Sequence, residues 1–157
     1  MTSLTHSLPA EPQIAPDTAL MLLVDADRDI RHINPALAAL VGYAAPELIG
    51  QPFPMLRHLD MPACAMREMW AMVEAGQVWM APIALRCRDG SRLWALASCA
   101  PVYHPLLGGS VAMMLMRPSE GELAAAIERY QWAHNRISTW LDKLALEPLG
   151  LDHVIRW

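Results

Sequence analysis

Three strand-like segments joined by short turns constrain the fold of this chain more than any other feature. They span residues 78–87, 92–102 and 110–116. Residues 88–91 read Arg-Asp-Gly-Ser, and Gly108-Gly109 precede the third segment, so both connections are short and contain glycine. Such connections join antiparallel strands, because a parallel crossover needs a dozen or more residues. Pro82 lies inside the first segment and cannot donate a ladder hydrogen bond, so this strand is predicted at the edge of the sheet.

The first half of the chain predicts a hairpin followed by helices. In order, the expected elements are a hairpin over residues 20–33, a helix opened by Asn34 and Pro35, a helical turn at 45–50 and an amphipathic helix at 62–75. Asparagine before proline is a standard N-cap and first helical position. Glycine follows each helical segment and favours its end. Strands and helices in separate groups predict an α+β fold.

A long amphipathic helix is predicted near the C-terminus. Ser119 and Glu122 form a capping-box pattern at its start. A seam then recurs at steps of four and three, at Leu123, Ile127, Tyr130, His134, Ile137, Leu141 and Leu144. This spacing fits two structures equally, the seam of a helical dimer and a helix docked on its own sheet. His134 is interpreted as a polar seam residue rather than a ligand.

The length of the chain indicates one domain with appended segments. Its 157 residues, 54% of them hydrophobic, suffice for a large core but are too few for two ordinary domains. We divide the chain into an N-terminal arm at 1–17, a core domain at 18–117, a helix at 119–146 and a tail at 147–157. The arm is rich in proline and is expected to be extended.

Charge and hydropathy restrict the class of partner. The net charge is −4 and the basic residues are scattered, which gives no footprint for nucleic acid or an anionic membrane. The longest uncharged apolar run, Thr18 to Val24, is far shorter than the roughly 20 residues that cross a bilayer. Cys64, Cys87 and Cys99 lack disulfide or zinc-site spacing. We expect a cytoplasmic chain, without membrane insertion, whose partner is a small molecule or a protein.

Residues 57–62, Arg-His-Leu-Asp-Met-Pro, resemble the RHPDMP motif of PAS domains of the aerotaxis-receptor type, which are flavin-binding oxygen and redox sensors. Further short matches lie on both sides of this motif and occur in the order that the family has. They are Asn34, Gly42-Tyr43, 47–52, Met69-Trp70, Gly76 with Trp79, and Arg88-Asp89-Gly90 with Trp94. The likeness runs from about Asp17 to Tyr130. It implies a PAS fold, in which helices cover one face of a five-stranded antiparallel sheet around a pocket, with a C-terminal amphipathic helix added.

The same resemblance implies non-covalent FAD, held by Asn34, Arg57, His58, Asp60 and Trp79. Arg57 and His58 would meet the phosphates or the electron-rich edge of the flavin, Asp60 would fix the arginine or a ribosyl hydroxyl, and Trp79 would wall the ring. Each residue also has a simpler interpretation. Asn34 would be only an N-cap, Arg57 and Asp60 would pair to hold the loop, His58 would lie in a surface turn, and Trp79 would belong to the core.

Ala81 and Leu85 depart from the family's pattern, which has glycine and asparagine at these positions. Strand alternation places both on the same face as Trp79, toward the expected pocket. Leucine cannot pair with the polar edge of a flavin, which would leave polar atoms unpaired at roughly 1–3 kcal/mol. The pocket could therefore hold FAD, hold a more apolar molecule, or be filled by the protein's own side chains.

These observations predict a sensor rather than an enzyme. The first hypothesis is cytoplasmic redox or oxygen sensing through FAD, with the C-terminal helix as output or as a homodimer interface. The alternative is a cofactor-free PAS module that dimerises or docks on a signalling protein, which Ala81 and Leu85 favour. Haem would require His58 or His104, neither of which lies in a haem motif, and Cys64 is not in the Asn-Cys-Arg setting of flavin photosensors. The sequence shows no nucleophile–base pair, phosphate loop or nicotinamide site.

Overall fold

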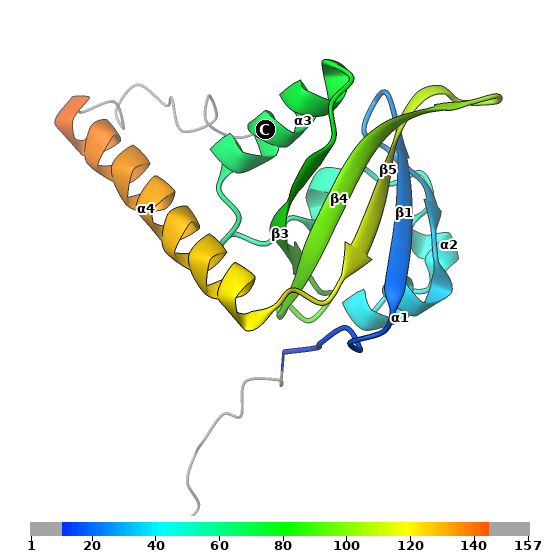
Figure 1. Cartoon of the computed structure of the whole chain (residues 1–157), viewed down its shortest axis with the longest axis horizontal. Coiled ribbons are helices and arrows are strands. Elements are labelled where there is room, and N and C mark those ends of the chain that lie inside the picture. The colour runs from blue at the N-terminus through cyan, green and yellow to red at the C-terminus, as the bar shows by residue number, and fades with distance from the viewer. Residues whose placement is uncertain (1–10, 145–157) are drawn as a thin grey trace, which may run out of the picture.

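The computed structural model describes residues 11–144, and side chains to residue 134, with the elements in the predicted order. They are β1 (Ala19–Asp25), β2 (Ile30–Ile33), α1 (Pro35–Val41), α2 (Ala45–Leu48), η1 (Phe53–Leu56), α3 (Ala63–Glu74), β3 (Trp79–Arg86), β4 (Arg92–His104), β5 (Gly108–Met116) and α4 (Glu120–Leu144). Figure 1 shows the sheet at the centre, with α4 running past the edge formed by β3. This is the predicted α+β arrangement.

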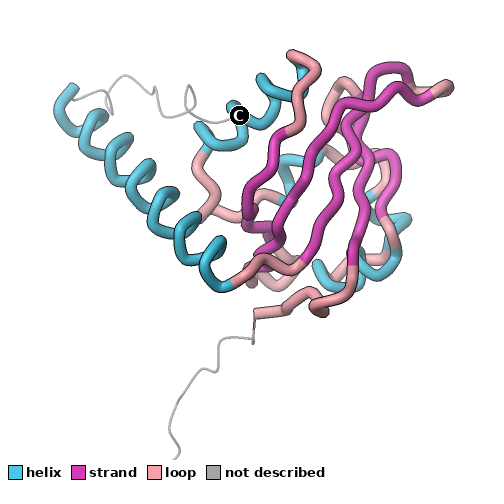
Figure 2. The backbone as a smooth tube through the Cα atoms, viewed as in Figure 1, coloured by secondary structure: helices cyan, strands magenta, loops and turns pink. Residues whose placement is uncertain are grey.

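The five strands form one antiparallel sheet in the order β2-β1-β5-β4-β3 (Figure 2). The first and last strands along the chain therefore meet at the middle of the sheet. Strand β3, which contains Pro82, is an edge strand, as predicted. Trp79, Ala81, Ile83 and Leu85 are all buried, but Pro82 and Ala84 between them are buried too. Burial therefore does not alternate along β3, and the predicted alternation of its faces stays a prediction.

The inner face of the sheet packs against the helices that precede β3. Met69 of α3 approaches Cys99 of β4, with their sulfur atoms 3.5 Å apart. Phe53 of η1 meets the ring of Trp70 edge-on, at 6.0 Å between centroids. Burial raises the pKa of the Cys99 thiol to about 12, so this cysteine is an inert core residue.

The caps of α1 have the predicted chemistry. The side chain of Asn34 accepts a hydrogen bond from the Leu37 N–H at 2.9 Å, and Pro35 takes the first helical position. Gly42 ends the helix with φ +88°, a left-handed conformation that favours glycine. A Cβ at Gly42 would also lie 3.2 Å from the Cβ of Arg88, so both backbone and packing select glycine here.

Asp25 organises the turn between β1 and β2. Its side chain is 8% exposed, contacts Arg31 Nε at 2.6 Å and accepts hydrogen bonds from the N–H groups of Asp27 and Asp29. Burial acts to raise the pKa of Asp25, but the hydrogen bonds from Arg31 and the backbone outweigh it and leave the pKa below its ordinary value. The ionised carboxylate therefore stabilises the fold.

Asp25→Asn is expected to lower the free energy of unfolding at neutral pH by about 1.5–3 kcal/mol, because charged hydrogen bonds are lost. A lowered pKa gives a contribution that is complete above the ordinary value of 3.8 and disappears as the pH falls through the native value. Urea denaturation of both proteins at several pH values measures this. Their difference should shrink below pH 3.8; a difference independent of pH would contradict the account. Asp27→Asn is the control at an exposed carboxylate.

Helix α4 begins with the predicted capping box. Glu122 N–H donates to Ser119 Oγ at 3.2 Å, and Ser119 N–H donates to Glu122 Oε1 at 3.3 Å. Leu123, Ile127 and Tyr130 then pack against the domain core, so the docked arrangement is confirmed for this half of the helix. The seam positions Ile137, Leu141 and Leu144 have side chains outside the described residues. None of the helices in the described part of the chain is long and apolar enough to cross a membrane.

Candidate functional site at the edge strand

The outer edge of β3 is covered by two segments that lie far apart in the sequence. The N–H of His58 donates to the carbonyl of Ala84 at 3.1 Å, and Arg57 forms a bridge with Leu85. From the other side, the hydroxyl of Tyr130 on α4 donates to the carbonyl of Pro82 at 2.7 Å. Unpaired backbone N–H and C=O groups at a sheet edge can pair with another chain, so these contacts protect β3 from such association. They also connect the strand to the loop and to α4.

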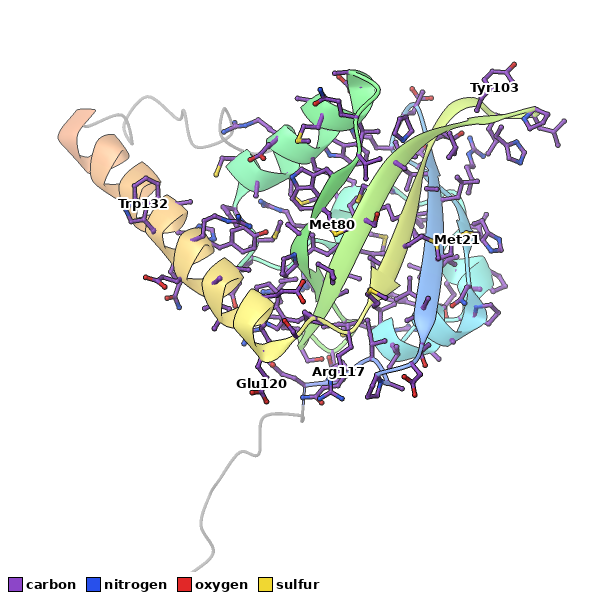
Figure 3. The ribbon with its side chains drawn as sticks, in the orientation of Figure 1. Met21, Met80, Tyr103, Arg117, Glu120 and Trp132 are labelled. Atoms are coloured by element: carbon purple, nitrogen blue, oxygen red, sulfur yellow. The ribbon has the colours of Figure 1, made fainter. Side chains whose placement is uncertain are left out.

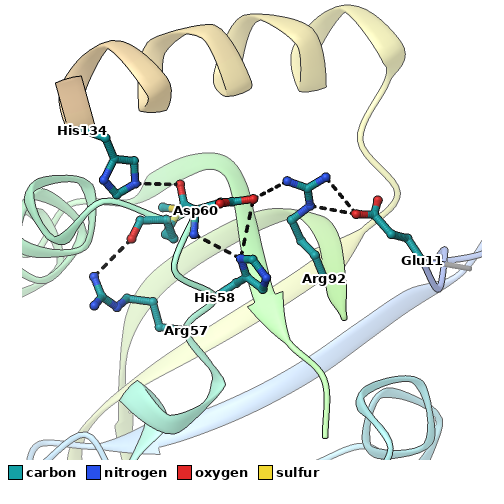
Figure 4. Close-up of polar contacts among 7 residues, drawn as sticks. Glu11, Arg57, His58, Asp60, Arg92 and His134 are labelled. Carbon is teal, nitrogen blue, oxygen red and sulfur yellow. Dashed lines mark hydrogen bonds and ion pairs between the residues drawn. The ribbon is translucent and has the colours of Figure 1, made fainter. Parts of the chain in front are cut away.

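The loop that carries the Arg-His-Leu-Asp-Met-Pro motif is held by its own residues. Arg57 Nη1 donates to the carbonyl of Met61 at 3.1 Å, and the N–H of Asp60 donates to His58 Nδ1 at 3.1 Å (Figure 4). Burial lowers the pKa of Arg57 below its ordinary value, although the guanidinium stays charged. The motif thus builds a compact turn between η1 and α3.

Asp60 connects this loop to three other parts of the chain. Its carboxylate pairs with Arg92 at the start of β4, and Arg92 Nη2 lies 2.8 Å from Glu11 Oε1. The ring of His134 on α4 lies 3.2 Å from the backbone carbonyl of Asp60. We call Glu11, His58, Asp60, Arg92 and His134 the polar junction. It joins the N-terminal arm, the motif loop, the sheet and α4 (Figure 4).

Tyr130 is the main apolar anchor of α4. It is 3% exposed and stacks on Trp94 of β4, with centroids 6.4 Å apart and planes at 11°. Burial raises the pKa of its hydroxyl, which therefore stays protonated and able to donate to Pro82. The helix is thus attached to the sheet by one stacked ring and one buried hydrogen bond.

The structure brings three of the five expected site residues together. Arg57, His58 and Asp60 share the motif loop, whereas Asn34 caps α1 and Trp79 is a buried residue at the start of β3. The simpler interpretations of Asn34 and Trp79 are therefore satisfied by observed contacts. Their roles toward a ligand stay predictions.

Sequence analysis did not single out Glu11, Arg92 or Pro82 as site residues. Arg92 is 81 residues from Glu11 and 32 from Asp60, so no local pattern indicates these pairs. Tyr130 did give a signal, because it lies on the predicted seam. The seam position predicted that Tyr130 makes an apolar contact, but not which surface it contacts.

Comparison with known proteins identifies the family. A PAS-domain family model matches residues 17–117. The chain is 31% identical over 118 residues to the aerotaxis receptor of Escherichia coli (strain K12), which is 75% of this chain and 23% of the receptor. It is 29% identical over 83 residues to the nitrogen fixation regulatory protein of Klebsiella pneumoniae, which is 53% of this chain and 17% of that protein. The matched region thus spans less than a quarter of either relative.

Solved structures agree with this assignment. A light-oxygen-voltage domain studied with a flavin analogue superposes with a TM-score of 0.61 at 18% identity, covering 73% of this chain and 87% of that domain. The dark structure of the blue-light photoreceptor Aureochrome1 LOV gives 0.59 at 17% identity, covering 73% and 86%. Likeness at this identity establishes the fold. The family model, which matches more than half of the chain, shows that the chain belongs to the PAS domain family.

Proposed function

We propose that this PAS domain is a non-enzymatic signalling module that works without a flavin, with α4 as its output. Sensing is the role that its relationship to the aerotaxis receptor supports. The absence of flavin is inferred from one observation, the close packing of core side chains between α3 and the sheet. Met66, Met69, Ile83, Leu85 and Met113 meet there and are 0–2% exposed.

These exposed fractions bear on whether a flavin would fit. A cavity large enough for an isoalloxazine ring would expose the side chains around it to a water-sized sphere, even if it were sealed from solvent. Close packing instead fills this space, and methionine suits the task because its unbranched side chain adapts to irregular gaps. Leu85 also offers no hydrogen bond to the polar edge of a flavin. The packing of these residues therefore supports a domain that works without FAD.

Redox sensing through FAD is the second candidate, and two observations favour it. The chain is 31% identical to the aerotaxis receptor, and one superposed light-oxygen-voltage domain was studied with a flavin analogue. The isoalloxazine ring of FAD would have to displace core side chains to enter the interior. If the purified protein carries FAD, and Arg57→Ala and Asp60→Ala lose it while staying folded, this candidate replaces the first.

Output through α4 is supported by the contacts of Tyr130. Its hydroxyl donates to the carbonyl of Pro82, which lies between Ala81 and Ile83 in β3. Its ring stacks on Trp94. A change in the packing of β3 would therefore alter the docking of α4. The polar junction adds a second link, from Asp60 to His134.

Hydrogen exchange in Tyr130→Phe tests this output. The variant keeps the stacked ring and removes the hydroxyl, so exchange should rise together in β3 and in the first turns of α4. Tyr103→Phe makes the same chemical change at a tyrosine that is 80% exposed and should leave both segments unchanged. Faster exchange in α4 alone, or in neither segment, would contradict coupling between them.

The partner is proposed to be a protein, either a second copy of the chain or a downstream signalling protein. Met21, Met80 and Trp132 present exposed apolar surface for such contacts (Figure 3). A mass measurement by light scattering separates a homodimer from a monomer that awaits another partner. We further propose that the chain works in the cytoplasm, because its cysteines are unpaired, as is usual in a reducing compartment.

A further inference from the structure

A cavity of about 500 Å³ opens at the end of the sheet where β5 begins, opposite the end from which α4 departs. Three elements meet there: the β1–β2 turn, the last turns of α3 and the β4–β5 hairpin. The residues that matter for its chemistry are Arg28, Trp70, Val73, Glu74, Val102 and Ser110. The proposed function and the polar junction make no use of this site.

Arg28 is held over the wall of this cavity. Its guanidinium carbon lies 4.6 Å from the ring centroid of Trp70, and its backbone has φ +67°, in the left-handed region. Its ion-pair contact with Glu74 is 3.7 Å long, and the two side chains are 37% and 71% exposed. A pair this exposed contributes little, and a guanidinium carries five N–H donors, so a better-placed acceptor can compete for it.

Trp70 lines the cavity beneath the guanidinium of Arg28. The residue is 4% exposed, and its indole Nε1 is buried without a hydrogen-bond partner among the described residues. Because this N–H has almost no accessible surface, a ligand in the cavity meets Arg28 rather than the indole N–H. Val73 and Val102 add apolar surface beside Arg28.

The charged residues that line the cavity determine which ligand charge is favoured. Asp25 also lies on the lining, but its carboxylate is engaged by Arg31 and by two backbone N–H groups. Glu74 is thus the carboxylate that competes for Arg28. An organic cation is disfavoured, because the guanidinium of Arg28 already covers the face of Trp70 on which a cation would sit.

We propose that this cavity binds a small aromatic carboxylate. The ring lies against Val73 and Val102, and the carboxylate takes the place of Glu74 on Arg28. Arginine and carboxylate form strong, geometrically specific pairs, which favours this class over neutral aromatic molecules.

Titration of the ¹⁵N-labelled full chain with 3-phenylpropanoate tests the proposal. The indole N–H signal of Trp70, assigned by its loss in Trp70→Phe, should move saturably. The uncharged analogue 3-phenylpropan-1-ol should bind at least about tenfold more weakly, because it cannot form the charged pair. An unmoved Trp70 signal up to about 10 mM probe, or equal affinity for acid and alcohol, would overturn the proposal.

Two variants fix the roles of the charged residues. Arg28→Gly suits the left-handed backbone, so the fold should persist while affinity for 3-phenylpropanoate falls at least about tenfold. Glu74→Gln removes the competing carboxylate and should strengthen binding about two- to fivefold. Unchanged binding in Arg28→Gly, or weaker binding in Glu74→Gln, would show that the anion does not bind Arg28 in this way.

Discussion

Tyr130→Ala is expected to lower the free energy of unfolding by about 3–5 kcal/mol, the usual cost of truncating a large buried aromatic side chain. The substitution removes the ring that stacks on Trp94 and leaves the carbonyl of Pro82 without its 2.7 Å hydrogen bond. Because both contacts attach α4, the helix should also lose protection from hydrogen exchange. Urea denaturation followed by circular dichroism, with exchange on the native protein, measures the two effects.

Tyr103→Ala provides the matched control, since Tyr103 is 80% exposed and should change stability by less than about 0.5 kcal/mol. If Tyr130→Ala behaved like this control and α4 kept its protection, then Tyr130 would not anchor the helix. Loss of protection in α4 together with intact protection in β3 would indicate that the helix docks without affecting the strand.

Leu85→Asn is expected to destabilise the domain by about 3–5 kcal/mol without creating flavin binding. Leu85 is 2% exposed and faces the interior, so an amide there loses apolar contacts and buries polar atoms. The same substitution introduces the asparagine that the resemblance to flavin-binding PAS domains of the aerotaxis-receptor type implies at this position. The variant therefore distinguishes between two possibilities, an interior filled by side chains and an interior that can accept a cofactor.

Leu106→Asn is the control for the chemical change, because Leu106 is 89% exposed. Denaturation and the absorption spectrum are measured on both variants. A Leu85→Asn protein as stable as the wild type that acquires FAD would show that the interior opens readily for flavin, contrary to our account.

The fold could be predicted from the sequence because its signals are local. Asn34, Pro35 and Gly42 mark the ends of one helix, and Ser119 with Glu122 marks the start of another. Pro82 identified the edge strand from its missing N–H. Each of these residue types has one physical reason to occupy a helix end or an edge strand. The neighbouring sequence is therefore enough to assign the element.

The site could be predicted only in part, because its remaining contacts depend on tertiary packing. The seam spacing of Tyr130 is compatible with a partner helix or with the domain's own sheet, and only the position of Trp94 in space decides between them. The link from Glu11 through Arg92 to Asp60 joins three distant segments. Whether Met66 and Met69 fill the interior likewise depends on how flexible side chains meet, which spacing does not reveal.

The measurement that tests the central claim most directly is the visible absorption spectrum of the purified full chain, before and after incubation with FAD and removal of the excess. A domain with a closed interior should be colourless, should release no flavin on heating and should acquire none, while its circular dichroism shows a folded α+β protein. Flavin absorption near 450 nm, at a stoichiometry approaching one FAD per chain, would contradict the claim and establish a flavoprotein.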